Sequence, residues 1–130
     1  MHEPPWVAII DDDEAVRKST IRLLRHTGIP AVGFCSAEEF LQWSSGSEPG
    51  CLVLDIHLGS GLNGFELRQR LESDGRPLPI VFVTGRPDDP LLKAQVPDWV
   101  ADVLSKPFEA HDLYARVRRH VRSAPGPIPS

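Results

Sequence analysis

Five short apolar runs constrain the fold of this chain more than any other feature of its sequence. The runs are rich in β-branched, aromatic and other apolar residues, and each is too short to make a stable helix, so each predicts a buried strand. The segments between them change to helical spacing. The runs cover residues 6–10, 31–35, 51–55, 78–84 and 100–105.

The first two intervening segments carry clear helix signals. Residues 14–27 place apolar side chains at helical spacing, and Gly28 then ends the helix in the expected way. Residues 36–43 open with Ser36, and Glu39 follows three residues later, which predicts a capping box on a short helix.

The later segments differ in strength. Residues 65–73 and 106–123 have an apolar side at helical spacing and predict amphipathic helices. Residues 85–99 predict a weak helix at best, because Pro87, Pro90 and Pro97 interrupt it.

Strand and helix therefore alternate five times, which predicts an α/β fold. We expect a doubly wound, five-stranded parallel sheet with helices on both faces. A length of 130 residues is that of a single domain. We assign residues 1–122 to this domain and residues 123–130 to a flexible, proline-rich tail.

Charge and composition argue against several classes of function. The net charge is -4, whereas a chain that itself grips nucleic acid or an anionic membrane needs a basic surface. No apolar run approaches the length of a membrane span, and the N-terminus lacks the pattern of a signal peptide. Cys35 and Cys51 are expected to be buried thiols, which suits a reducing cytoplasm.

Polar residues follow four of the five predicted strands at the point where the strand ends. The carboxyl ends of parallel strands share one edge of the sheet, and ligand sites in such folds lie beyond that edge. Residues far apart in the sequence should therefore meet there. They are Asp11 and Asp12 after the first strand, Asp55 at the end of the third, Thr84 at the end of the fourth and Lys106 after the fifth.

These residue types predict phosphoryl chemistry on a metal site. Clustered carboxylates favour a hard divalent cation such as Mg²⁺, with Mn²⁺ as a second option. A carboxylate beside that ion can attack a phosphoryl group and form an aspartyl phosphate. The ion and a lysine would stabilise charge on the transferring oxygens, and a threonine hydroxyl could donate to one of them.

Four motifs in this order and spacing resemble the receiver domains of response regulators in two-component systems, which have the CheY-like, flavodoxin-like fold. The resemblance covers residues 6–122. Within that family the chain is most similar to receivers of regulators with a LuxR-type DNA-binding domain. The motifs are "IIDDDEAVRKS", "CLVLDIHLGSGLNGFEL", "IVFVTG" and "LSKPF".

The resemblance implies a role for each of these residues. Asp55 would be the phosphorylation site, accepting the phosphoryl group from a histidine kinase or a phosphotransfer protein. Asp12 would bind Mg²⁺ directly and Asp11 would assist. The Asp55 carboxylate and the backbone carbonyl of His57 would also bind the metal.

On the same grounds Thr84 would be the switch hydroxyl, and Lys106 would pair first with Asp55 and then with the phosphoryl group. The Lys106–Pro107 peptide is expected to be cis. Asp13 matches no ligand position in the family, so we assign it to the N-terminus of the first helix.

Three departures from the family pattern stand out. Gly59 replaces the usual proline after the acceptor, and Gly64 lies one residue later than expected, which predicts a mobile loop. Val103 occupies the position of the aromatic residue that reports phosphorylation, so conventional switching is in doubt. The third departure is the proline-interrupted fourth helix. At two further positions, His57 and Arg86, the side chains are expected to tune the lifetime of the phosphate.

The residues leave two alternatives open. One is a phosphatase or phosphotransferase with an aspartyl nucleophile at Asp11, where Asp13 would supply the second carboxylate. The other is a degenerate receiver that serves only as an interaction module. We favour a cytoplasmic phosphoacceptor that is not an enzyme in its own right, and the sequence leaves open whether it forms a homodimer.

Overall fold

The computed structural model describes residues 5–43, 47–86, 88, 90 and 102–123. In this part of the chain five parallel strands form one sheet in the order β2-β1-β3-β4-β5. This order is that of the flavodoxin-like fold, so the predicted fold class is confirmed. The strands are β1 (Val7–Ile10), β2 (Ala31–Phe34), β3 (Cys51–Asp55), β4 (Ile80–Thr84) and β5 (Asp102–Ser105).

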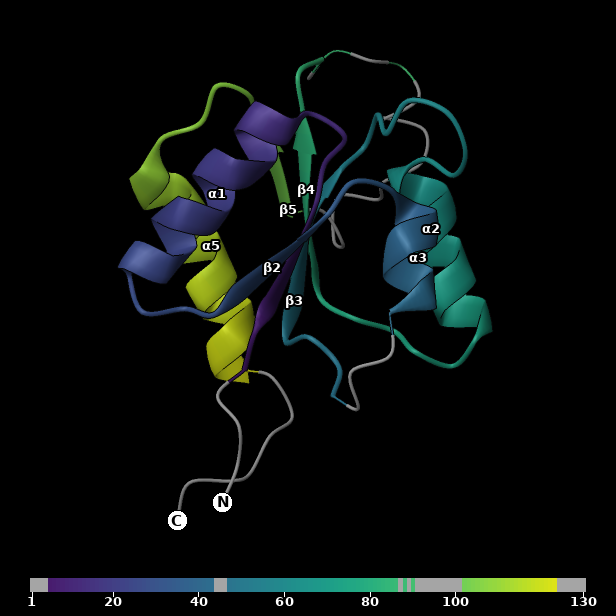
Figure 1. The fold of residues 1–130 in the computed structure, drawn as a ribbon, viewed down its shortest axis with the longest axis horizontal. Coiled ribbons are helices and arrows are strands. Elements are labelled where there is room, and N and C mark those ends of the chain that lie inside the picture. The colour runs from purple at the N-terminus through teal and green to yellow at the C-terminus, as the bar shows by residue number, and fades with distance from the viewer. Residues whose placement is uncertain (1–4, 44–46, 87, 89, 91–101, 124–130) are drawn as a thin grey trace.

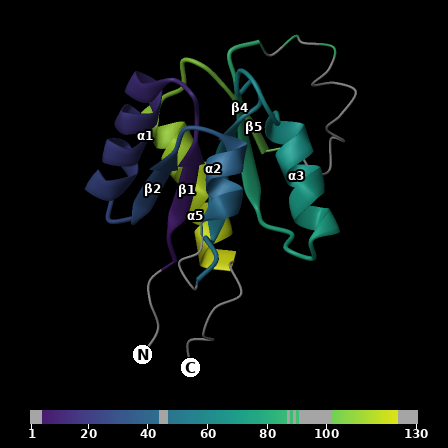
Figure 2. The ribbon, with the colours of Figure 1, turned by 45° about the vertical axis from the view of Figure 1, so that its right-hand side comes forward.

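Helices cover both faces of the sheet. Figures 1 and 2 show α1 and α5 on one face and α2 and α3 on the other. The predicted fourth helix falls mainly on residues 91–101, which lie outside the described residues. Of the predicted tail, 123–130, Ser123 is the last residue of α5, and 124–130 lie outside the described residues. The described helices are α1 (Glu14–His26), α2 (Ala37–Gln42), α3 (Gly64–Ser73) and α5 (Ala110–Ser123).

The strands are buried on both faces because successive side chains enter different layers of the core. Ile10 and Leu54 pack in the layer under α2 and α3. Val7 and Val53 pack in the layer under α1 and α5, together with Leu113 of α5. Two separate apolar layers explain why the central runs of the sequence have no polar side chain before their last position.

The helix ends follow the predicted signals with one correction. The Ser36 hydroxyl accepts a hydrogen bond from the Glu39 N–H at 3.0 Å, as a helix cap should. Glu39, however, does not close the predicted capping box. Its carboxylate accepts instead from the N–H of Cys35, at 3.0 Å, and from the Cys35 thiol. Cys35 is therefore exposed rather than buried, whereas Cys51 is buried as expected.

A capping box that the sequence reading missed begins α3. The Asn63 side chain accepts from the Glu66 N–H, and the Glu66 carboxylate accepts from the Asn63 N–H, both at 2.9 Å. This reciprocal pair determines where α3 begins after the loop that follows β3.

The first residue of α3, Gly64, lies in close contact with the end of β3. Its N–H donates to the Ile56 carbonyl at 3.0 Å. A Cβ atom at this position would lie 2.8 Å from the Asp55 carbonyl oxygen and 3.0 Å from the Ile56 Cα. Glycine thus allows a helix to start directly beside the strand end that carries Asp55.

Gly64→Ala should lower the free energy of unfolding by about 1–3 kcal/mol, because its Cβ would collide with backbone atoms that have no room to yield. The measurement is urea unfolding monitored by circular dichroism. Gly85→Ala is the matched control, since nothing lies within 4 Å of a Cβ there and its φ is not in the left-handed region. Equal losses of stability in the two variants would contradict this account of Gly64.

Candidate functional site

The carboxyl edge of the sheet brings together the polar residues that the sequence placed at the strand ends. Asp11 directly follows β1, while Asp55 is the last residue of β3 and Thr84 the last of β4. All three are buried, with 5%, 6% and 0% of their surface exposed. Burial of two carboxylates at one edge requires positive charge close by.

Lys106, just after β5, supplies that charge. Its Nζ atom lies 3.1 Å from Asp11 Oδ2 and 3.0 Å from Asp55 Oδ2, so one ammonium bridges both carboxylates. The residue pairs span 95 and 51 positions of sequence. Only the parallel order of the strands makes this contact available.

The surroundings of Asp11 and Lys106 raise the pKa of both side chains. Burial raises the pKa of Asp11 above its ordinary value, and the nearby charge of Asp55 raises it further, against the opposing effects of its hydrogen bonds and of Lys106. Burial alone would lower the pKa of Lys106, but the hydrogen bond and charge of Asp55, and then of Asp11, raise it overall. Lys106 therefore stays charged, and the pKa of Asp11 lies above that of an exposed aspartate.

Asp12 completes an acidic cluster. One carboxylate oxygen from each of Asp11, Asp12 and Asp55 lies within 4.8 Å of the others, and Asp12 is exposed to solvent. Three carboxylates facing one ammonium leave two negative charges uncompensated, which matches the charge of a divalent cation. A ligand set made only of oxygens suits Mg²⁺ or Mn²⁺.

Asp13 has a different role from its two neighbours. Its side chain accepts from the Val16 N–H at 3.1 Å and caps α1. Its own N–H donates to Asp11 Oδ1 at 2.9 Å. The run of three aspartates thus divides between the acidic cluster and the helix cap.

The remaining predicted residues lie around this cluster. The N–H of His57 donates to Asp55 Oδ1 at 3.0 Å. The N–H of Arg86 donates to Thr84 Oγ1 at 2.9 Å, while the Arg86 residue itself is exposed. The Lys106–Pro107 peptide bond is cis.

Val103 packs in the apolar core. It pairs with Phe82 in the sheet and is a partly buried residue packed on the apolar layer under α2 and α3. Valine at position 103 therefore fills part of the apolar core.

Arg17 is a contributor that the sequence reading missed. Its guanidinium donates to the Asp11 carbonyl at 2.8 Å and so supports the backbone of the acidic cluster. Its stem crosses Gly33 of β2, where a Cβ would lie 3.1 Å from two carbons of Arg17 and 2.6 Å from Ile21. A glycine inside a predicted strand often marks such a close approach, and this was the available signal.

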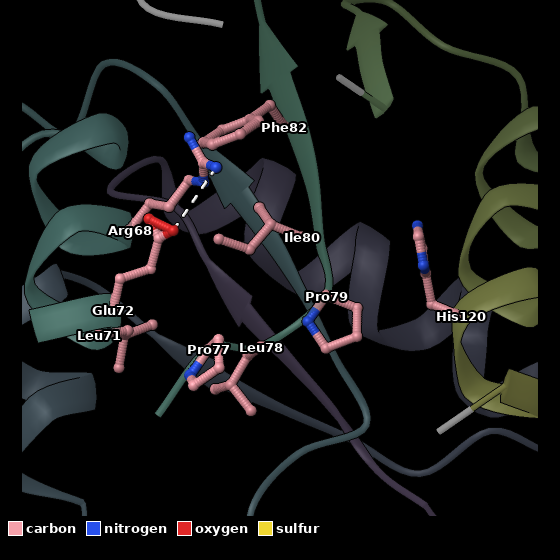
Figure 3. A pocket seen from close by; sticks show the side chains of 9 residues that line it. All are labelled: Arg68, Leu71, Glu72, Pro77, Leu78, Pro79, Ile80, Phe82 and His120. Carbon is pink, nitrogen blue, oxygen red and sulfur yellow. Dashed lines mark ion pairs between the residues drawn. The ribbon is translucent and has the colours of Figure 1, made fainter. Parts of the chain in front are cut away.

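A separate cavity of about 230 Å³ lies between α3, β4 and α5 (Figure 3). Its charged residues Arg68 and Glu72 form an ion pair at 3.6 Å across one turn of α3. Because these charges compensate each other and most of the lining is apolar, we place the chemistry at the acidic cluster. The other lining residues are Leu71, Pro77, Leu78, Pro79, Ile80, Phe82 and His120.

A family model for the response regulator receiver domain matches residues 7–118 of the chain. The chain belongs to this family. None of the helices in the described part of this receiver has the length and apolar character needed to cross a bilayer.

Known relatives agree with this assignment. The transcriptional regulatory protein FixJ of Bradyrhizobium diazoefficiens is 36% identical over 118 residues, which are 91% of this chain and 57% of FixJ. The response regulator TodT of Pseudomonas putida is 31% identical over 119 residues, 92% of this chain and 52% of TodT. The receiver spans about half the length of these curated relatives.

The solved structure of FixJ-N superposes with a TM-score of 0.80 at 28% identity, and the match covers 97% of this chain and 100% of that one. Similarity to FixJ agrees with the expected closeness to receivers of LuxR-type regulators. The fold and the family predicted from the motifs are therefore confirmed.

Asp12→Ala should lower the Mg²⁺ affinity of the receiver by at least about tenfold, because it removes a carboxylate of the acidic cluster. Asp13→Ala should leave the affinity within about twofold and instead cost about 1 kcal/mol of stability through the lost helix cap. Calorimetric Mg²⁺ titration and urea unfolding of both variants give the two quantities. Equal losses of Mg²⁺ affinity would show that the cluster does not divide as described.

Proposed function

We propose that this receiver accepts a phosphoryl group from a histidine kinase, or from a phosphotransfer protein, onto Asp55 in the cytoplasm. Response regulators partner with histidine kinases, and the chain belongs to that family. The observation that carries the proposal is the shared contact of Lys106 with Asp11 and Asp55 inside a cluster of three carboxylates.

In this reaction an oxygen of Asp55 forms a new bond to phosphorus while the bond between phosphorus and the donor's histidine nitrogen breaks. The electron pair of that bond stays on the imidazole, which takes up a proton. Lys106 already lies at hydrogen-bond distance from Asp55 and would turn to an oxygen of the arriving phosphoryl group.

Asp11, Asp12 and Asp55 would hold Mg²⁺, with the backbone carbonyl of His57 as a further ligand. When bound, the ion supplies positive charge that offsets the negative charge of the carboxylates and the phosphoryl oxygens. Mn²⁺ would fit the same oxygen ligands.

Thr84 would carry the signal away from the phosphate. Its hydroxyl accepts a hydrogen bond from the Arg86 N–H. A turn of the hydroxyl toward a phosphoryl oxygen would therefore change this hydrogen bond and shift the backbone after β4. With valine at position 103, we propose that switching proceeds through this loop rather than through a moving aromatic ring.

We expect the wild-type receiver to gain the mass of one phosphoryl group from acetyl phosphate and Mg²⁺, and Asp55→Asn to gain none. Intact-protein mass spectrometry measures both. Asp74→Asn is the matched control, because Asp74 is an exposed aspartate at the end of α3.

The same experiment separates the alternatives. Repeated turnover of the donor that Asp11→Asn abolishes would indicate a phosphatase or phosphotransferase. A wild-type chain that never gains the phosphoryl group would favour a degenerate receiver and contradict the proposal.

The phosphate should decay faster in His57→Ala and in Arg86→Ala, because we propose that both side chains hinder the approach of water to Asp55. We expect half-lives shorter by a factor of about three, equivalent to about 0.7 kcal/mol of activation free energy. Loss of the phosphoryl mass with time gives the half-life, and Arg70→Ala, on the exposed side of α3, serves as control. Unchanged half-lives in both variants would remove this role.

A further inference from the structure

The loop between β3 and α3 is tied to a helix from another part of the chain. The carboxylate of Glu38, in the first turn of α2, accepts a hydrogen bond from the Leu62 N–H at 2.9 Å. The two residues are 24 positions apart. This hydrogen bond, and one from its own backbone N–H, lower the pKa of Glu38, so the carboxylate is ionised and the bond is charge-assisted.

The loop is shaped to admit this carboxylate. Gly61 has a φ of +87°, in the left-handed region. A Cβ there would lie 2.7 Å from Glu38 Oε2 and 3.0 Å from Oε1. Glycine at position 61 therefore meets two needs together, since it permits the backbone turn and leaves space for the Glu38 oxygens.

The other side of the same loop lies against the acidic cluster. Gly59 has a φ of +74°, and a Cβ on it would lie 3.0 Å from Asp12 Oδ2. Its neighbour Leu58 is 3% exposed and packs in the layer under α2 and α3. The short segment 59–62 thus connects the Glu38 carboxylate to the Asp12 carboxylate.

The segment between the two carboxylates is short and rich in glycine. Three peptide steps separate Gly59 from Leu62, so the segment spans at most about 10 Å. Two glycines give its backbone wide freedom in the absence of external contacts. The contact with Glu38 therefore decides which of the accessible conformations the loop adopts beside Asp12.

We propose that Glu38 is a positioning residue for the metal site, which holds the β3–α3 loop against Asp12 without itself contacting the ion. The inference rests on the proposed function, because it assumes that Asp12 binds Mg²⁺. Glu38 acts through the backbone of Leu62 and Gly61, and the loop in turn restricts the orientations open to the exposed Asp12 side chain.

The adjacent residue on α2 provides a matched control. Glu39 carries the same charge in the same helical turn, but its carboxylate accepts from the Cys35 N–H and does not reach the loop in the described contacts. Glu38→Ala and Glu39→Ala therefore change net charge and helix composition equally. Only the first removes the contact with Leu62.

The test measures two quantities in Glu38→Ala, Glu39→Ala and Glu38→Gln. The first is the exchange rate of the Leu62 and Gly61 amide hydrogens by NMR in the absence of Mg²⁺, and the second is the Mg²⁺ affinity by calorimetry. Glu38→Ala should speed exchange at Leu62 and weaken Mg²⁺ binding by about three- to tenfold, less than the loss of a direct partner of a metal ligand. Glu39→Ala should keep both within about twofold of the wild type.

Glu38→Gln retains an oxygen that can accept from Leu62, so its Mg²⁺ affinity should lie between those of the wild type and Glu38→Ala. This variant also tests the inference if the alanine variant fails to fold. If the wild type binds Mg²⁺ and both Glu38 variants bind it with the same affinity, the proposed role of Glu38 is wrong while the proposed function stands. A wild-type receiver that binds no Mg²⁺ would overturn the proposed function and this inference with it, whatever the amide exchange shows.

Discussion

One ammonium group between two buried carboxylates is the interaction on which the rest of this receiver depends. Lys106 follows the edge strand β5 and reaches Asp11 and Asp55 along the carboxyl edge of the sheet, and neither aspartate could be buried as an anion without it. Lys106 does not neutralise the cluster, because Asp12 adds a third carboxylate. The fold holds an excess of negative charge at one edge and leaves that edge open to a cation.

Close approaches at glycine make this arrangement compact. Gly64 lets α3 begin beside the end of β3, and Gly33 lets the stem of Arg17 cross β2 to reach the Asp11 carbonyl. Gly59 lets the following loop lie against Asp12. A side chain at Gly64 or Gly59 would collide with Asp55 or Asp12, and one at Gly33 would collide with Ile21 and with the stem of Arg17.

The parts of the site that follow from strand order could be predicted from the sequence. Five apolar runs implied parallel strands, so Asp11, Asp55, Thr84 and Lys106 had to share one edge. The contact of Glu38 with Leu62 could not be predicted, because it depends on how a side chain crosses to an element elsewhere in the fold. For Arg17 the one signal was Gly33, which marks a close approach without naming its partner. Local sequence patterns also gave a wrong prediction where two backbone N–H groups could bind the same carboxylate.

Cys35 and Glu39 illustrate that competition. The spacing from Ser36 to Glu39 predicted a capping box, yet the carboxylate binds one residue earlier, at Cys35. The strand predicted over residues 31–35 ends at Phe34, so Cys35 lies outside the sheet and its thiol is exposed. The exposure of Cys35 and the partner of Glu39 both depend on the residue at which β2 ends. A local sequence pattern does not fix a strand end to within one residue.

The most direct test of this account is the urea unfolding of the wild-type receiver at increasing Mg²⁺, with ionic strength held constant. If the uncompensated carboxylates bind the ion only in the folded state, the free energy of unfolding should rise by about 1.4 kcal/mol for each tenfold increase in Mg²⁺ above its dissociation constant. A free energy of unfolding that is independent of Mg²⁺ would contradict the central claim that the acidic cluster is a cation site.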